Sequence, residues 1–301
     1  MTIAVTGGTG FVGTRFIDIA TAAGHEVRAL TRRPQRPQRQ VEWVDGALED
    51  AEALRKLVTG CDSVVHIAGV LKASDAKDFD RGNVEGTLAM LAASTAAGIS
   101  RFVHVSSLAA REPQLSLYGA SKARSEELVE RSGLDWVIVR PPAVYGPGDK
   151  ETLDLFKMAR RGQIFMPPRG RLSLIHVGDL ARLLLACADE SAPSKLVIEP
   201  DDGRAGGWSH REFGDALGRA VGTPARTVST PRFLLSFASR ADRLVRGANA
   251  KLTADRVAYF CHPDWVVTAG KCPPGDLWKP QVETGRGLAE TAAWYEREGW
   301  L

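Results

Sequence analysis

Short apolar runs alternate with helix-spaced apolar positions through the first half of the 301-residue chain. The runs have the lengths of buried strands and cover residues 3–5, 25–31, 41–44, 63–69 and 101–105. Between them we expect helices over 12–23, 49–58, 83–97 and 118 to about 132, and apolar residues recur at helical spacing over the first and the third of these. Strands that alternate with helices predict βαβ units, and therefore an α/β protein with a doubly wound parallel sheet.

Helix-spaced patterns dominate the rest of the chain. They cover residues 153–161, 179–188, 210–221, 232–245 and 252–260. We therefore expect a smaller, mainly helical C-terminal part that selects the substrate. Its most apolar stretch either lines a pocket or forms the core of this part, and the pattern leaves both open for Phe233, Leu234, Leu235 and Phe237.

A glycine-rich turn over residues 6–13 follows the first predicted strand. Gly7 lets the chain turn, Gly10 lets the backbone approach a pyrophosphate, and Gly13 lets the next helix lie close to the sheet. Because that helix begins directly after Gly10, its N-terminus can hold the phosphates. The turn predicts a Rossmann-type dinucleotide-binding fold, and the alternative is an ordinary strand-to-helix connection.

Composition narrows the class of protein. With 44% hydrophobic and 25% charged residues, the chain has the make-up of a soluble globular protein. Its net charge is +3 without a long block of one sign, so we expect no nucleic-acid partner. No apolar run reaches the length of about 18 residues that a membrane span needs, and the first strand leaves no room for a signal peptide. We therefore expect a cytoplasmic protein. Four scattered cysteines without a CxxC pair indicate neither a disulfide framework nor a metal site.

The end of the second predicted strand indicates which cofactor fits. In dinucleotide folds, a carboxylate at this position accepts hydrogen bonds from the ribose 2′-hydroxyl of NAD. This chain has Thr31, Arg32 and Arg33 there, and guanidinium groups suit a 2′-phosphate. We therefore expect NADP(H) to be preferred, with NAD(H) possible. In the alternative interpretation, residues 32–39 are only a solvated surface loop.

Ser107, Tyr118 and Lys122 form the candidate catalytic group. Ser107 follows the strand over 101–105, at the carboxyl edge of the sheet where ligands bind. Tyr118 and Lys122 stand four residues apart on one helix face, so the ammonium can lie near the phenol. A phenol with a pKa of about 10 must lose roughly three units to act as a base near neutral pH, and we expect the ammonium to help lower it. The alternative is a surface helix with a solvated lysine.

Several motifs together resemble the extended short-chain dehydrogenase/reductase family, also called the NAD-dependent epimerase/dehydratase family. They occur in the family's order and span nearly the whole chain, at residues 6–13, 83–87, 105–107, 118–122, 140–149, 174–179 and 278–295. The resemblance implies that Ser107, Tyr118 and Lys122 are catalytic, that Asn83 supports the lysine side, and that Pro141 borders the nicotinamide.

The turn, the strand ends and the resemblance together define an expected cofactor-binding set. It comprises Gly7, Gly10, Phe11, Val12, Thr31, Arg32, Arg33, Leu48, Ala68, Gly69, Asn83, Ser106, Tyr118, Lys122, Pro141, Ala143 and Val144. The expected NAD(P)-binding domain covers residues 1–150 plus about 171–190. The expected substrate-binding part covers 151–170 and 191–301.

Departures from the family pattern separate the possible functions. Leu108 and Ala109 stand where sugar-nucleotide 4,6-dehydratases have Asp-Glu, so the proton-transfer groups of water loss are missing. Ala143 stands where nucleotide-sugar epimerases usually have Asn. The absence of this Asn looks more like the 3β-hydroxysteroid dehydrogenase and carbonyl-reductase branches of the family. The short link between Ser107 and Tyr118 is similar to that of an NADPH-binding accessory subunit of respiratory complex I.

We therefore expect an NAD(P)-dependent oxidoreductase that interconverts a secondary alcohol and a carbonyl on a small, partly apolar molecule. A nucleotide-sugar epimerase and a non-catalytic NADPH-binding sensor or assembly protein remain alternatives. The expected partner is the small-molecule substrate. The family's habit of pairing helices between subunits also makes a homodimer possible.

Overall fold

The computed structural model describes residues 1–73, 75–247 and 253–301. The chain forms two compact units. The first contains residues Met1–Pro141, Gly178–Glu199 and Lys271–Lys279, and the second contains Pro142–Val177, Pro200–Gly270 and Pro280–Leu301. The assignment of cofactor binding and substrate binding to parts of the chain stays a prediction.

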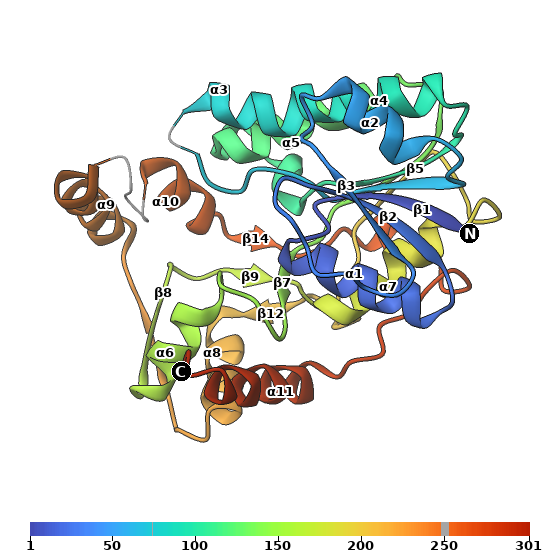
Figure 1. Cartoon of the computed structure of the whole chain (residues 1–301). Helices are drawn as coiled ribbons and strands as arrows, with labels where there is room; N and C mark the ends of the chain where they lie inside the picture. Colours follow the sequence, from blue (N-terminus) through green and yellow to red (C-terminus); the bar gives the residue numbers. More distant parts are fainter. Residues whose placement is uncertain (74, 248–252) are drawn as a thin grey trace. The chain divides into compact units, whose positions relative to one another are not determined.

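A seven-stranded parallel sheet forms the centre of the first unit (Figure 1). Its strands are β1 (Thr2–Thr6), β2 (Glu26–Thr31), β3 (Val41–Asp45), β4 (Ser63–His66), β5 (Arg101–Val105), β6 (Asp135–Val139) and β11 (Leu196–Ile198), in the order β11-β6-β5-β4-β1-β2-β3. Every neighbouring pair is parallel. The order reverses at β1, so β1 and β4 form the switch point where ligands bind in such sheets. The predicted doubly wound Rossmann-type sheet is confirmed.

Helices cover both faces of this sheet (Figure 1). One face carries α2 (Ala51–Val58), α4 (Gly86–Ala96) and α5 (Leu117–Glu130), and the other carries α1 (Phe11–Ala22) and α7 (Val177–Ala188). The helix predicted over 83–97 is wrong at its start, because helical structure begins with α3 (Ala76–Phe79) and a π-helix over Asp80–Glu85. Phe79 is the one buried residue of α3, so no apolar period revealed this turn.

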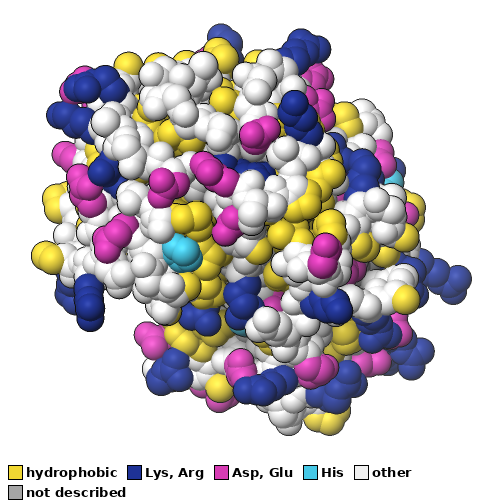
Figure 2. All heavy atoms as spheres, turned by 90° about the vertical axis from the view of Figure 1, so that its right-hand side faces the viewer, with side chains coloured by type: hydrophobic (Ala, Val, Ile, Leu, Met, Phe, Trp, Pro, Cys, Tyr) yellow, Lys and Arg dark blue, Asp and Glu magenta, His cyan; other side chains and the backbone are white. Residues whose placement is uncertain are grey.

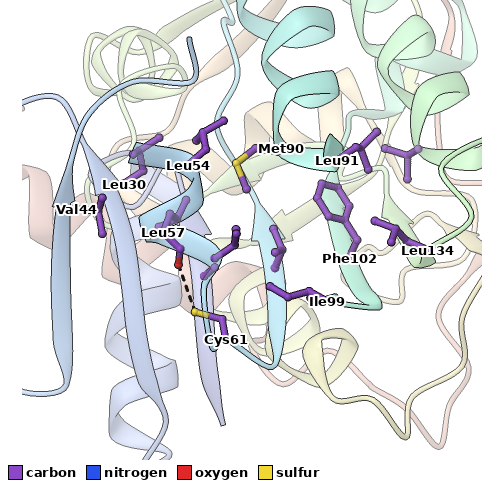
Figure 3. Close-up of a cluster of buried hydrophobic side chains, with 14 of the residues drawn as sticks. Leu30, Val44, Leu54, Leu57, Cys61, Met90, Leu91, Ile99, Phe102 and Leu134 are labelled. Atoms are coloured by element: carbon purple, nitrogen blue, oxygen red, sulfur yellow. Dashed lines mark hydrogen bonds between the residues drawn. The ribbon is translucent and has the colours of Figure 1, made fainter. Parts of the chain in front are cut away.

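The helix α2 illustrates how local sequence signals and packing agree. Asp50 caps its N-terminus by accepting hydrogen bonds from the backbone N–H groups of Glu52 and Ala53, both at 3.0 Å. The buried face of the helix is apolar and packs in the cluster of Figure 3, with Leu54 and Leu57 pointing to Met90 of α4. Burial of each such side chain contributes about 1.5–3 kcal/mol.

The second unit combines helices with three small sheets. The strands are β7 (Ala143–Tyr145), β8 (Gln163–Met166), β9 (Arg171–Leu172), β10 (Leu174–His176), β12 (Trp208–Ser209), β13 (Arg226–Ser229) and β14 (Asp264–Trp265), paired as β10-β7, β12-β9-β14 and β13-β8. The helices are α6 (Leu153–Arg160), α8 (His210–Ala220), α9 (Arg232–Arg246), α10 (Ala254–Phe260) and α11 (Thr284–Arg297). Its core contains Phe156, Phe213, Leu217, Leu288 and Tyr295.

The helices α9 and α10 differ in how they agree with the sequence-based expectations. Phe233, Leu234 and Phe237 are exposed, so the interpretation that they form the core is wrong. The helix predicted over 252–260 corresponds to α10, and residue 252 lies outside the described residues. Within the described ranges, no helix combines the length and the apolar character that crossing a bilayer requires.

Candidate functional site

The turn between β1 and α1 leaves no room for side chains at Gly7 and Gly13. Gly7 has a φ of +73°, and a Cβ there would lie 2.7 Å from the backbone N of Ala68. A Cβ on Gly13 would lie 2.0 Å from the carbonyl oxygen of Gly7. Gly10 is the N-cap of α1 and offers no side-chain cap to the helix, whose first turn has no acidic residue. The first N–H groups of α1 are therefore suited to an anion such as a pyrophosphate.

The end of β2 is a tight turn that leaves two arginines at the surface. The hydroxyl of Thr31 donates to the carbonyl of Arg33 at 2.7 Å and accepts from its N–H at 3.2 Å. Thr31 is buried, whereas Arg32 and Arg33 are exposed. The two guanidinium groups stand beyond the strand next to β1, which is the side of the sheet that the ribose of a dinucleotide would reach.

Among the residues of the expected cofactor-binding set, Leu48 lies in apolar surroundings. It is partly buried against the hydrophobic cluster of Figure 3. A Cβ on Gly86 would lie 2.6 Å from its Cδ1, so Leu48 is in close contact with the start of α4. Its surroundings are those of an apolar wall.

Asn83 joins the segment after β4 to α5. Its Oδ1 accepts from the N–H of Val70 at 2.7 Å, and its Nδ2 donates to the carbonyl of Val70 at 3.1 Å and to Ser121 Oγ at 2.8 Å. A Cβ on Gly69 would lie 3.0 Å from Asn83 Oδ1 and 3.9 Å from Lys122 Nζ. The fold thus brings Gly69, Asn83 and Lys122 together. The π-helix that presents Asn83 is a type of distortion frequent at functional sites.

The three candidate catalytic residues lie at the carboxyl end of β5. Ser107 follows the strand, and its Oγ accepts from the N–H of Ala109 at 3.2 Å. Tyr118 and Lys122 lie in the first turns of α5, which begins at the N-cap Ser116. The Nζ of Lys122 is buried and donates to the carbonyl of Val105 at 2.8 Å.

Burial is the largest influence on the pKa values of Tyr118 and Lys122. It raises the pKa of Tyr118 to about 12, against the opposing effect of a hydrogen bond from Ser107. It lowers the pKa of Lys122 to about 8, against the attraction of the Glu126 carboxylate. The expected lowering of the Tyr118 pKa is therefore wrong for the chain on its own. Burial penalises the phenolate more than the surrounding groups stabilise it.

A buried ion-pair network lies one helical turn beyond Lys122, and its charged residues were not among those predicted for the site. Glu126 accepts from Arg140 and from the hydroxyl of Ser106, while Arg140 also donates to Glu199 at 3.4 Å. The Ser106 side chain therefore points to Glu126. The spacing of four residues from Lys122 to Glu126 was the available signal.

A second network runs through the sheet below the glycine turn. Thr6 Oγ1 accepts from the N–H of Ala68 at 3.2 Å and contacts His66 Nδ1 at 2.7 Å. The other ring nitrogen of His66 lies 3.1 Å from Thr87 Oγ1, which donates to the carbonyl of Asn83 at 2.7 Å. Burial and the charge of Lys122 lower the pKa of His66 to about 3, so the ring is neutral and links the turn to the segment of Asn83.

The remaining predicted residues are divided between the two units. Phe11 and Val12 form the first positions of α1, and both are partly exposed. Pro141 ends the first unit, and its carbonyl accepts from the N–H of Leu108 at 2.9 Å. Ala143 and Val144 lie on β7 of the second unit. Within the first unit the structure thus brings Gly69, Asn83 and Lys122 together. The assignment of every residue of the expected set to cofactor binding stays a prediction.

The chain has relatives along its whole length. A ceramide reductase of Caulobacter vibrioides (strain NA1000 / CB15N) is 34% identical over 308 residues, covering 99% of this chain and 96% of that protein. A putative dihydroflavonol 4-reductase of Synechocystis sp. (strain ATCC 27184 / PCC 6803 / Kazusa) is 29% identical over 332 residues, covering 99% and 95%.

Solved structures share the fold. MoeE5 in complex with UDP-glucuronic acid and NAD superimposes with a TM-score of 0.75 at 20% identity, covering 99% of both chains. UDP-N-acetylglucosamine 4-epimerase from Bacillus cereus gives a TM-score of 0.74 at 18% identity, covering 98% and 96%. Residues 3–198 match the NAD dependent epimerase/dehydratase family. This chain therefore belongs to that family, as an NAD(P)-dependent enzyme of the extended short-chain dehydrogenase/reductase type.

Proposed function

We propose that this enzyme reduces a carbonyl to a secondary alcohol on a small, partly apolar substrate, with NADP(H) as the preferred cofactor. The observation that carries the proposal is that Ser107, Tyr118 and Lys122 lie together at the carboxyl end of β5. The Tyr118 phenol, with a pKa of about 12, is protonated at physiological pH and accepts a hydrogen bond from Ser107. A neutral phenol is a proton donor, which is what the oxygen of a ketone needs as it becomes an alcohol.

Ser107, Tyr118 and Lys122 have separate roles in the proposed reduction. A bound reduced nicotinamide supplies the hydride that the carbonyl carbon receives. Ser107 donates a hydrogen bond to the substrate oxygen, and Tyr118 gives that oxygen its proton, so that a hydroxyl group forms. Below its pKa of about 8, Lys122 carries the positive charge that stabilises the phenolate left behind. Water then returns the proton to Tyr118.

Features of the first unit support a nicotinamide cofactor. The uncapped N-terminus of α1 supplies N–H groups for the pyrophosphate. The exposed guanidinium groups of Arg32 and Arg33 suit a 2′-phosphate, and no carboxylate in residues 31–33 opposes it.

Relatives support reduction over the other chemistries of the family. Two are named as reductases, and a third, 33% identical over 225 residues, as a 4-hydroxy-2-methyl-3-oxo-4-farnesyl-3,4-dihydroquinoline-1-oxide ketoreductase of Stigmatella aurantiaca. By analogy with those names we propose an apolar ketone as the substrate. Leu108 and Ala109 are buried and offer no acid or base for dehydration.

The test is the oxidation of NADPH by a panel of apolar ketones, followed by absorbance. We expect Tyr118→Phe to lower kcat by about 10²-fold or more. NADPH binding is measured by fluorescence alongside, because Tyr118 also belongs to the expected cofactor-binding set, and kcat should fall by a larger factor than NADPH affinity. Lys56→Met, at an exposed position of α2, is the control and should keep the wild-type kcat. Full turnover by Tyr118→Phe would contradict the mechanism.

Two further measurements, the nucleotide released on denaturation and a thermal scan with nucleotide sugars, separate the alternatives. A nucleotide-sugar epimerase would contain tightly held NAD and would be stabilised against heat by a uridine or thymidine diphosphate sugar. Ala143 disfavours the epimerase alternative, because nucleotide-sugar epimerases usually have Asn at this position. A sensor or assembly protein would bind NADPH but transfer no hydride to any ketone of the panel.

A further inference from the structure

The helix α9 presents its apolar side chains to solvent. Phe233 is 70% exposed, Phe237 71%, Leu244 88% and Val245 83%. At 100° per residue, these side chains fall within one third of the helix circumference, together with Leu234, and we call this arc the α9 apolar face. A surface helix of a globular protein normally turns such a face inward.

The opposite side of α9 is the buried one. Ser239 is 5% exposed, and Ser236 and Asp242 are partly buried. Leu235, which is partly buried, is the large apolar side chain on this side, and both phenylalanines of the helix point outward. A contiguous group of five exposed apolar side chains marks an interaction site. Exposing these side chains of the α9 apolar face to water costs free energy that burial against a partner would recover.

The charge of the segment identifies the kind of partner. Residues 232–246 contain four arginines and one aspartate, so their net charge is +4 − 1 = +3, as large as that of the whole chain. Arg232, Arg240 and Arg246 are exposed. Arg240 falls at the edge of the apolar face, whereas Arg232 and Arg246 lie on the opposite arc of the helix, where Arg246 pairs with Asp242 at 3.0 Å. On the face of the molecule drawn in Figure 2, by contrast, acidic and basic side chains are interspersed. A partner of α9 is therefore apolar where it meets the helix and negative beside Arg240.

A lipid bilayer with anionic headgroups has this chemistry. The apolar face contains Phe, Leu and Val without a hydrogen-bonding group, whereas a protein interface carries about one hydrogen bond per 100–200 Å². A helix of 15 residues is about 22 Å long and can lie in the plane of the interface, with its apolar side among the acyl chains and Arg240 at the phosphates. We propose that α9 docks this enzyme on an anionic membrane surface. The proposal does not depend on the reductase activity.

The test is co-sedimentation of the full chain with lipid vesicles. We expect binding to vesicles of mixed phosphatidylcholine and phosphatidylglycerol, and weaker binding to pure phosphatidylcholine or at high salt. Phe233→Ser/Phe237→Ser should lower the binding constant by about tenfold or more, because it removes the two aromatic side chains of the face. Arg240→Glu should lower it by about fivefold or more on the anionic vesicles.

A matched control uses an exposed apolar residue on another helix. Leu88 of α4 is 54% exposed, and Leu88→Ser should leave vesicle binding within about twofold of the wild type, since it lies outside the apolar face. Because all substituted residues are exposed, the thermal unfolding of each variant checks that the fold is intact. The proposal is overturned if the wild type does not bind anionic vesicles, or if Phe233→Ser/Phe237→Ser binds them equally well. Without vesicle binding, a dimer that this variant converts to monomers would assign the face to a second copy of the chain.

Discussion

Arg140 holds both carboxylate oxygens of Glu126, with its Nε 2.9 Å from Oε1 and an Nη 2.6 Å from Oε2. The pair is buried, and Glu126 lies one helical turn after Lys122 on α5. The arrangement places a negative charge where it opposes the loss of the Lys122 proton, and it fixes that charge through Arg140.

Removal of Arg140 should destabilise the fold strongly. Arg140→Met leaves the buried carboxylates of Glu126 and Glu199 without their guanidinium partner, and breaking such a pair costs about 3–5 kcal/mol. Arg160→Met is the control, because Arg160 and Glu296 form an exposed pair at 3.0 Å. Exposed pairs contribute about 0–1 kcal/mol. Urea unfolding measures both variants, and equal losses would contradict the importance of the buried network.

Lys122 should make stability depend on pH in the alkaline range. Its pKa is about 8 in the folded chain and near 10.5 when unfolded, so the unfolded state binds more protons between these values. The contribution of Lys122 to the free energy of unfolding therefore rises between pH 8 and 10.5, by about 3 kcal/mol in all. Lys122→Met lacks this rise.

The measurement for Lys122 is the difference in unfolding free energy between the wild type and Lys122→Met at several pH values. We expect the unfolding free energy of the wild type to rise relative to that of Lys122→Met from pH 8 to 10.5, by about 3 kcal/mol in all. The exposed Lys56 provides the control, since Lys56→Met should differ from the wild type by a constant amount. A constant difference for Lys122→Met as well would show that the ammonium is not buried as described.

His66 should weaken the fold in acid. Its pKa is about 3 in the folded chain against 6.5 in its ordinary state, so the folded protein resists the proton that the unfolded chain takes up. Below pH 6.5 the free energy of unfolding should fall by about 1.4 kcal/mol per pH unit from this residue. His104, whose ring stacks on His66 at 5.6 Å, adds to the slope because burial also lowers its pKa. Chemical denaturation between pH 7 and 5 should show a shallower slope for His66→Gln, and an unchanged slope would refute this assignment.

The exposed arginines after β2 should decide the choice of cofactor. Arg32→Ala/Arg33→Ala should raise the KM for NADPH by about tenfold or more, because charge-assisted hydrogen bonds to the 2′-phosphate are lost. The KM for NADH should change little, since NADH has no such phosphate. Arg36→Ala, exposed in the same loop, is the control for a general effect of positive charge. Equal losses for both cofactors would mean that the two arginines do not recognise the phosphate.

Local pattern predicted much of the first unit. The strand over 101–105 was predicted with its observed bounds, and the helix after the glycine turn was found because Phe16 and Ala20 mark its buried face. The spacing of Tyr118 and Lys122 also sufficed to place them on one helix. These features depend on residues near one another in the chain, where backbone preferences and apolar periodicity act directly.

Tertiary structure decided what depends on distant residues. Glu126 and Arg140 meet because α5 and β6 belong to one unit, and the raised pKa of Tyr118 follows from burial that no local pattern records. The apolar residues of α9 gave the same periodicity whether they faced inward or outward, and only the packed chain showed them outside. The sequence thus determined the family and most strands and helices of the first unit, because periodicity and motif order are properties of the chain itself. The protonation of the site and the orientation of α9 were decided by tertiary structure, because both depend on which atoms exclude water.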